Sequence, residues 1–492
     1  MKVESHSIEE RFEFSSKAKK TLAIIVLVGI VLFGIGCYQA ANPGNHDTGH
    51  ATADTHGKAE DAAKEEEGFL KPTPGHSAGE QILIEKERAS WAKTEISNQI
   101  DEPKGFGAEE ITTKGEAEHG AEAGHGEESS WTKRLYANLW INNVFFAGIA
   151  LVGFFFYALQ FAASAGWSAG LKRIPLAFGS WLSISGILML VIFFLAQHDL
   201  FHWTHADLYD KGSSHYDEII DGKKGYLNVP FFIIRMVLYF IVWYGFYWFM
   251  RKEAIAEDLT GDTKHYVRSK WLSAFFIIFL AITNSTSSWD WLMSIDTHWF
   301  STMYGWFYFA ALFVTSLAAI TLFVVYLKEY GYLSIVNENH LHDLGKFVFA
   351  FSIFYTYIWF SQFFLIYYTN MPEETIYFLE RVNNIKYGAV FYGIIFLTFV
   401  FPFLLFMTRD AKRQIAMLKI VCIIVIAGQW LNFWLMVTPG VLQENGGLGF
   451  MEFGIAMIFG GAFVAVVLAS LSKLPLIAKN HPMLEESIHH HI

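Results

Sequence analysis

The chain has 492 residues, of which 53% are hydrophobic and 17% aromatic, whereas only 17% are charged. This apolar content exceeds what a soluble core could bury, so it indicates an integral membrane protein. The formal net charge is -11, and the acidic residues gather in one hydrophilic segment, which argues against a nucleic-acid partner. Cys37 and Cys422 are the two cysteines, too few for an iron–sulfur cluster or a covalently attached haem.

The first apolar run, Thr21 to Tyr38, follows a cluster of lysines. One interpretation is a signal peptide that ends in a lipoprotein-type motif at Cys37. However, Gly34 occupies the position where such a motif has a branched aliphatic residue. We therefore expect an uncleaved first transmembrane helix, with residues 1–40 forming a cytoplasmic N-terminus and this helix.

Nine further apolar runs are long enough to span a membrane. They are Tyr136 to Ala163, Leu176 to Gln197, Phe231 to Met250, Trp271 to Met293, Phe307 to Leu327, Phe347 to Tyr368, Tyr387 to Met407, Met417 to Val437 and Gly454 to Leu471. The fold class predicted is all-α, a polytopic protein of about ten transmembrane helices. A weak echo between Trp291-Leu292-Met293 and Trp434-Leu435-Met436 suggests two four-helix bundles, 134–300 and 301–440, flanked by the first helix and by a last helix with its tail, 441–492.

Lysine and arginine gather in the loops on the side of the basic N-terminus, whereas the loops around 297–305 and 438–453 have neither residue. By the positive-inside rule both termini are expected in the cytoplasm. Residues 41–133 are then extracytoplasmic. Their acidic, low-complexity composition is typical of disorder. Their histidines are irregularly spaced, so we expect them to lie in a solvated tail and not to bind a metal ion. The exception to disorder is Gln81 to Ile100, whose apolar stripe could dock on a partner.

An embedded haem requires axial histidines inside the helix bundle. None of the 19 histidines lies within a predicted span. His265, His340 and His342 fall in predicted cytoplasmic loops, and the others near the bundle lie at or beyond the outer helix ends, namely His198, His202, His205, His215 and His298. We therefore expect no cofactor held covalently or by metal ligands in this chain.

The fifth predicted span ends in an unusual polar sequence. Thr283 to Ser288 are all hydroxyl or amide residues, and Asp290 follows them. Hydrocarbon cannot satisfy such groups, so they must face protein or water, which makes Asn284, Ser288 and Asp290 candidates for a hydrated path. Alternatively, Asp290 only caps the helix or pairs locally at the membrane edge.

Arg235 lies a few residues inside the fourth span. It either faces the bundle interior, where Asp290, Asp296 or Asp199 could be its counter-charge, or extends to the outer interface. The deeper amides are expected to form interhelical hydrogen bonds, and three lysines at span ends are expected to extend to the interface. These residues are Asn142, Asn143, Gln362, Gln429 and Asn432 among the amides, and Lys346, Lys386 and Lys419 among the lysines.

Two strings carry a resemblance to a known family. They are Asp290-Trp291-x-Met293-Ser294-x-Asp296-x-His298-Trp299-Phe300-Ser301-Thr302 and Asn228-x-Pro230-Phe231-Phe232-x-x-Arg235. The chain from about Tyr136 to Leu474 resembles the NrfD/PsrC-like membrane subunits of bacterial alternative complex III, a quinol:electron-acceptor oxidoreductase. The long acidic segment after the first helix and the lack of histidine in the spans make it resemble the ActF-like subunit more than the ActC-like one.

The resemblance implies a cofactor-free membrane subunit of a respiratory quinol-oxidising complex that delivers electrons to cytochrome c or another acceptor. It implies a homologous ten-helix subunit, iron–sulfur and multihaem cytochrome c subunits, membrane phospholipid and a terminal oxidase as partners. It also implies a proton path or a quinone/quinol pocket. The candidate residues for this role are Asp290, His298, Asp296, Arg235, Ser288 and Asn284.

Two other functions remain open at this stage. A secondary transporter would place a site between two repeats, but no span has a glycine or proline break at its predicted midplane. A purely structural scaffold would anchor extramembrane redox subunits without chemistry of its own. Copurification with haem and iron–sulfur subunits would separate the transporter from the other two.

Overall fold

A computed structural model describes residues 10–41 and 130–491. Within these ranges ten helices are long and apolar enough to cross a membrane, which confirms the predicted all-α polytopic fold. The spans are α1 (Ser16–Ala41), α4 (Ser130–Ala162), α5 and α6 (Arg173–Phe178 and Leu182–Leu200), α8 (Val229–Thr260), α9 (Thr263–Trp291), α10 (Tyr304–Glu329), α11 (Glu338–Thr369), α13 with α14 (Ile385–Ile395 and Phe401–Leu405), α15 (Ile415–Leu442) and α16 (Phe450–Leu471).

Four spans, α8, α9, α11 and α13, begin at a polar side chain that caps the first turn. Asp262 accepts a hydrogen bond from the Lys264 N–H at the start of α9, and Asn337 accepts from the Asn339 and His340 N–H groups at the start of α11. The prediction that His265, His340 and His342 lie in loops is therefore wrong: all three lie in the first turns of helices.

The ten spans pack as two groups of four helices and one pair. In the first group α4 contacts α6 and α9, and α8 contacts both α6 and α9. In the second, α10 contacts α11 and α15, and α13 packs on α15. The central helices α4 and α10 contact each other and are almost wholly buried. The outer helices expose large apolar side chains, as expected towards lipid.

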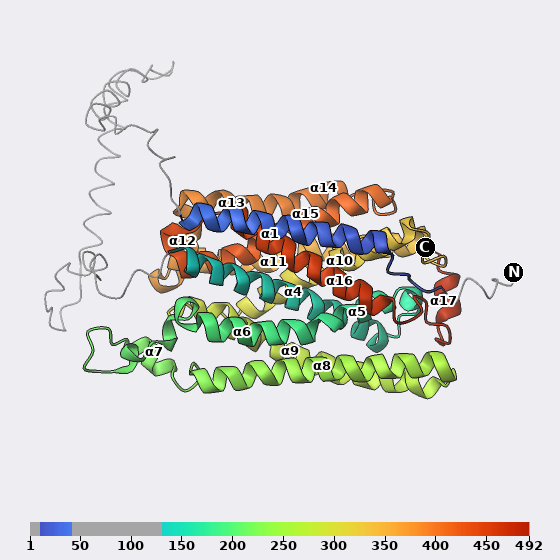
Figure 1. Cartoon of the computed structure of the whole chain (residues 1–492), viewed down its shortest axis with the longest axis horizontal. Helices are drawn as coiled ribbons and strands as arrows, with labels where there is room; N and C mark the ends of the chain where they lie inside the picture. Colours follow the sequence, from blue (N-terminus) through green and yellow to red (C-terminus); the bar gives the residue numbers. More distant parts are fainter. Residues whose placement is uncertain (1–9, 42–129, 492) are drawn as a thin grey trace, which may run out of the picture. The chain divides into compact units, whose positions relative to one another are not determined.

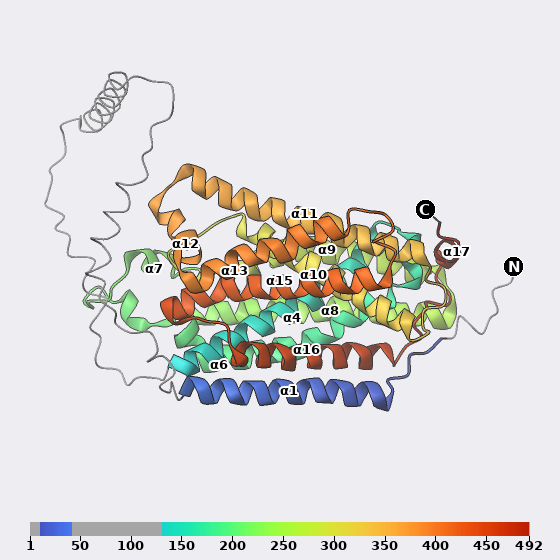
Figure 2. The same cartoon turned by 90° about the horizontal axis from the view of Figure 1, so that it is seen from above.

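The pair is α1 with α16, which lie side by side in both views (Figures 1 and 2). Glycines allow their backbones to touch. A Cβ atom at Gly36 would lie 2.3 Å from the Met451 nitrogen, and one at Gly454 would lie 2.5 Å from the Phe33 nitrogen. Close backbone approach through small residues is a common basis for helix association in membranes.

The two ends of the bundle differ. The tail end has the residues that precede α1 and the C-terminal helix α17 (Leu484–Ile488), and the Leu476 N–H donates to the Glu10 carbonyl there. The opposite end has two short helices, α7 (Glu218–Lys223) and α12 (Pro372–Asn383), and is called the α12 end below (Figure 2). Short 3-10 turns connect the rest: η3 (Gly166–Gly170), η4 (Gly179–Trp181), η5 (His202–Thr204), η6 (Ala206–Tyr209), η7 (Met293–Ile295) and η9 (Gln443–Asn445).

The eighth span is not a regular helix. Between α13 and α14 the residues Phe396–Val400 form a π-helical segment, η8, just before Pro402. Proline lacks an N–H and cannot donate to the preceding turn, so it disturbs the regular α-helical pattern. The eighth span is therefore irregular at η8, although α13, η8 and α14 follow one another without a gap. Nearly all of the 41–133 segment, including Gln81 to Ile100, lies outside the described residues.

Candidate functional site

Arg235 and Asp290 form a buried ion pair between α8 and α9. Arg235 Nε lies 2.8 Å from Asp290 Oδ2 and Nη2 lies 2.9 Å from Oδ1, a two-point contact that fits the planar guanidinium. Arg235 is 7% exposed and Asp290 1%. Arg235 therefore faces the bundle interior, and Asp290 is its counter-charge.

The local sequence explains how Arg235 reaches this position. Asn228 caps α8 by accepting from the Phe231 N–H, and Pro230 suits the first turn because its missing N–H would have no helical partner there. The guanidinium is also covered by the rings of Tyr226 and Phe231, 4.0 and 4.3 Å from their centroids, and donates to the Tyr226 carbonyl. All of its described contacts are therefore to protein.

The side-chain hydroxyls of the turn before Asp290 donate mainly to main-chain carbonyls of their own helix, α9. Ser287 donates to the Asn284 carbonyl and Ser288 to the Ser285 carbonyl. Asn284 donates to the Gly305 carbonyl of α10, while its side-chain oxygen has no hydrogen-bond partner among the described residues. These bonds use the donors of Ser287, Ser288 and Asn284, and leave the Asn284 side-chain oxygen as an unused acceptor in this run.

Asp296 belongs to a second buried pair, with Arg381 of α12. The carboxylate lies 2.9 Å from Arg381 Nη2. The guanidinium also donates to three main-chain carbonyls, those of Tyr377, Leu435 and Met436, and stacks on the Tyr377 ring at 3.4 Å. Asp296 itself is partly covered, with 16% of its side chain exposed.

Sequence reasoning missed Arg381. The available signal was an arginine on the side of the bundle whose other loops are poor in basic residues, within a short stretch that begins at Pro372. Its partners could not be found in this way, because the carbonyls of Leu435 and Met436 lie more than fifty residues further along the chain.

His298 lies apart from both arginine–aspartate pairs. Its Nε2 is 2.6 Å from the carboxylate of Asp217, which also caps α7 by accepting from the Ile219 and Ile220 N–H groups. Burial raises the pKa of Asp217, but the hydrogen bonds from Ile220 and His298 outweigh it and leave that pKa below its ordinary value. The six candidate residues thus fall into three places: the Arg235 pair with the polar turn, the Arg381 pair, and the His298 contact.

The segment between Asp290 and Thr302 links these places. The Trp140 indole of α4 donates to the Trp291 carbonyl at 2.8 Å. Further along, the Trp299 indole donates to the Glu374 carbonyl, and its ring stacks on Tyr377 with centroids 3.9 Å apart. The segment is therefore held to the first bundle at Asp290 and to α12 at Asp296 and Trp299.

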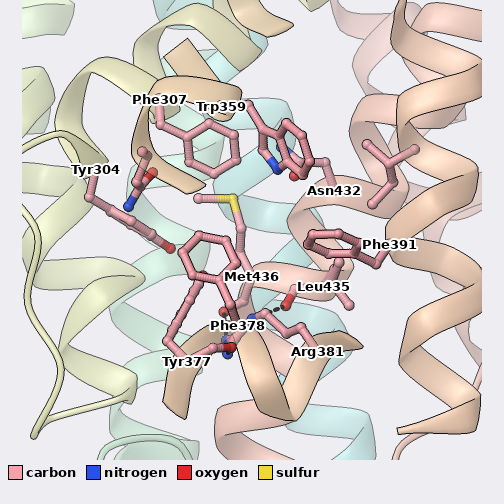
Figure 3. A pocket seen from close by; sticks show the side chains of 12 residues that line it. Tyr304, Phe307, Trp359, Tyr377, Phe378, Arg381, Phe391, Asn432, Leu435 and Met436 are labelled. Carbon is pink, nitrogen blue, oxygen red and sulfur yellow. Dashed lines mark hydrogen bonds between the residues drawn. The ribbon is translucent and has the colours of Figure 1, made fainter. Parts of the chain in front are cut away.

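A small cavity of about 20 Å³, enough for one water molecule, lies beside Arg381 inside the second bundle (Figure 3). Its walls are largely aromatic, with a few polar groups. The lining residues are Tyr304, Phe307, Trp359, Gln362, Tyr377, Phe378, Arg381, Phe391, Ile394, Asn432, Leu435 and Met436. No group of three histidine, cysteine, aspartate or glutamate residues in 10–41 and 130–491 is placed to hold a metal ion.

Comparisons with known proteins assign no family. No family model matches the chain, and no curated protein matches it significantly.

Proposed function

We propose that this chain is a cofactor-free integral subunit of a respiratory quinol:electron-acceptor oxidoreductase in a bacterial inner membrane, with both termini in the cytoplasm. Its partners in this proposal are a homologous ten-helix subunit, iron–sulfur and multihaem cytochrome c subunits, phospholipid and a terminal oxidase. Electrons pass through the redox cofactors of those partners, and this chain is a membrane subunit to which the partners bind.

The observation that carries the proposal is the Asp290 to Thr302 string. It resembles a signature of one family of respiratory membrane subunits, and its length and composition make a chance resemblance rare. The geometry is consistent with a specific role for the string, since its two aspartates each pair with a buried arginine. A purely structural scaffold would gain little from these two arginine–aspartate pairs, because buried ion pairs contribute little net stability.

Between a proton path and a quinone-type pocket, the geometry favours the pocket. Asp290 is held by two hydrogen bonds from Arg235, and the neighbouring Ser287 and Ser288 hydroxyls are occupied by their own helix. A relay through Asp290 would have to break that pair. The small cavity beside Arg381, in contrast, is lined by aromatic rings that suit a planar head group, and these rings would have to move apart to admit one.

Copurification tests the proposal. The full chain, tagged at its N-terminus and extracted from its native membrane in a mild detergent, is expected to bring haem absorbance and an iron–sulfur electron-paramagnetic-resonance signal with it. Mass spectrometry should find a second ten-helix subunit in the same fraction. Isolation of the chain without any redox subunit would overturn the proposal.

A secondary transporter is the competing function. The π-helical break in the eighth span, η8, is the specific feature in its favour, since transporters commonly have interrupted helices. Solute uptake by vesicles that contain only this chain would establish that alternative.

A further inference from the structure

Basic side chains gather at the tail end of the second bundle, where residues 406–414 join α14 to α15. This segment, called the basic turn below, packs against the N-terminal part of α11. A Cβ atom at Gly345 of α11 would lie 2.9 Å from the Lys412 Cβ and 3.1 Å from the Lys412 carbonyl oxygen. The Arg413 guanidinium donates to the Asn339 side-chain oxygen at 3.0 Å. Two cations of the basic turn are therefore held against one helix.

Lys412 is a buried cation without a counter-charge. It is 7% exposed, and its ammonium donates to the main-chain carbonyls of Thr408 at 3.2 Å and, more weakly, Met407 at 3.5 Å. It forms no ion pair with a carboxylate of the described residues. Burial and the positive charge of Lys346 lower the pKa of Lys412 below its ordinary value. Buried charges in proteins are normally paired, so this ammonium points to an anion that is bound from outside the chain.

Two nitrogen atoms beside Lys412 also have no partner. Arg413 Nε and His342 Nδ1 are buried without a hydrogen bond to any described residue, and His342 is 7% exposed. His342 lies three residues after Asn339, which Arg413 contacts, and three residues before Gly345, which Lys412 contacts. Residues at this spacing share one face of a helix. The imidazole therefore lies on α11 between the contact points of the two cations.

The start of α15 adds to the positive potential. The helix begins at Ile415, directly after the basic turn, and Gln414 gives its first turn no side-chain cap. The N–H groups of an uncapped first turn attract anions. The nearby carboxylate of Asp343 is already used, since it lies 2.5 Å from the Lys346 ammonium and 2.7 Å from His490 Nε2. These groups together favour an anion with several oxygen atoms, and phosphate is the one that arginine and lysine commonly bind.

Exposed apolar side chains flank the basic turn. Leu404 and Met407 precede its charged part and Ile420 follows it, and all three are exposed. They lie in or next to the ends of two membrane-spanning segments, so they face lipid in a membrane. A phosphate that is attached to acyl chains can reach the cations from the bilayer, whereas its chains remain on these apolar residues. Basic pockets between transmembrane helices are known to bind the head groups of anionic lipids.

We propose that the basic turn and the N-terminal part of α11 bind the phosphate head group of an anionic phospholipid in the leaflet at the tail end. Lys412 and Arg413 contact the phosphate oxygens, His342 donates a further hydrogen bond, and the acyl chains lie over Leu404 and Ile420. This inference uses the membrane-spanning fold and not the respiratory function. A chain that purifies without redox subunits loses the proposed function and keeps this site, and a chain that copurifies with them but fails the tests below loses only the site.

Photolabelling tests the location. The full chain is placed in phosphatidylcholine nanodiscs that contain a small amount of phosphatidylglycerol with a diazirine close to its head group. Label is expected mainly on peptides from 338–349 and 404–420, reduced by excess cardiolipin and retained in excess phosphatidylcholine or inorganic phosphate. Equal competition by phosphatidylcholine would show no selectivity for charge, and competition by inorganic phosphate would show a site for the free ion. Either result, or label spread evenly over the basic loops of both bundles, would overturn the proposal.

A matched set of variants tests the contacts. Lys412→Gln and Arg413→Gln each keep a hydrogen-bond donor and remove one charge. The affinity of the detergent-solubilised full chain for phosphatidylglycerol should fall about fivefold in each, the usual effect of one basic residue on the attraction to anionic lipid. Lys252→Gln removes an exposed charge from α8 in the first bundle and should leave this affinity unchanged. Native mass spectrometry, with phosphatidylglycerol and phosphatidylcholine as titrants, gives the dissociation constants.

Arg413→Gln keeps the test valid if the chain fails to fold when the more deeply buried Lys412 is replaced. Arg413 is only partly buried, so this variant should melt close to the temperature of the unaltered chain. A folded Arg413→Gln chain with unchanged affinity for phosphatidylglycerol would overturn the proposal. An equal loss of affinity in Lys252→Gln would also overturn it, because the attraction would then come from the general charge of this end and not from a site.

Discussion

Asp290 and Arg235 stand out in the sequence because charged residues are rare within apolar spans, and the structure pairs them with each other. The sequence could not show that Asp290 is buried or that Arg235 donates hydrogen bonds to both of its carboxylate oxygens. Arg381 was harder still to predict. Its importance comes from the carbonyls of Leu435 and Met436, which another helix supplies.

The Asp290 pair makes a prediction about stability. Asp290→Asn leaves the buried guanidinium of Arg235 without its counter-charge, so we expect a loss of about 3–5 kcal/mol in the free energy of unfolding. The double variant Arg235→Met with Asp290→Leu removes both charges and should recover most of this loss. Chemical denaturation of the detergent-solubilised chain measures both. A single variant as stable as the unaltered chain would contradict the prediction and return Asp290 to consideration as a group that changes its protonation.

Replacing Arg381 should lower the free energy of unfolding more than replacing Asp296 does. Arg381→Ala removes an ion pair and leaves the three carbonyls of Tyr377, Leu435 and Met436 without their donor, so a loss of about 3 kcal/mol or more is expected. Asp296→Asn keeps a hydrogen-bond acceptor near a guanidinium that has other partners, and should cost about 1 kcal/mol. Comparison of the two denaturation midpoints checks the order, and the reverse order would show that the carbonyl contacts matter little.

At the scale of the helix, hydropathy was a sufficient guide. All ten spans agree with the apolar runs to within a few residues at most ends, because a membrane-spanning helix must hide its backbone over the full hydrocarbon thickness. Two features lay beyond this signal. The helix α12 is too short and too polar to register as a span, and the π-helical segment η8 differs from its surroundings in hydrogen bonding and not in composition.

The contact between α1 and α16 gives a prediction with an internal control. Gly36→Leu would place side-chain atoms on the Met451 backbone, and such overpacking should separate the two helices locally. Gly34→Leu, two residues away, meets no atom within 4 Å of its new Cβ and should be tolerated. The rate of disulfide formation between cysteines introduced at Val26 and Gly461 reports the contact. Equal rates in the two leucine variants would contradict the assigned interface.

At the scale of the whole described bundle, the C-terminal tail joins the two halves. Ser487 accepts a hydrogen bond from the Gly170 N–H beside the first group of helices and donates to the Trp167 carbonyl. His490 lies 2.7 Å from the Asp343 carboxylate of α11 in the second group, and its carbonyl accepts from Asn337 and Asn339. Separation of the halves at this end therefore requires release of the tail.

The tail also predicts a pH dependence. Burial, reinforced by the positive charges of Lys172 and Arg173, lowers the pKa of His481 from 6.5 to about 2. Between these values the unfolded chain binds a proton that the native chain does not, so stability should fall as the pH is lowered below about 6.5, by at most about 1.4 kcal/mol per pH unit.

His481→Phe keeps the ring against Phe161 and Tyr266 and removes the titration. Its unfolding midpoint should change less between pH 7.5 and 5.5 than that of the unaltered chain. His489→Phe, at an exposed position of the same tail, should keep the unaltered slope. Parallel slopes for all three proteins would show that His481 is not the group responsible.

The pairing of α1 with α16 has a consequence for synthesis on the ribosome. Among the described spans α1 precedes all the others, and its principal contacts are with α16, which begins more than four hundred residues later. Until α16 has been synthesised, the face of α1 that contains Gly29 and Gly36 lacks its native partner. An insertion factor can bind this face during that time. A nascent chain stalled before residue 450 has no α16, so its α1 should crosslink to such factors, and release of that crosslink should coincide with the emergence of α16.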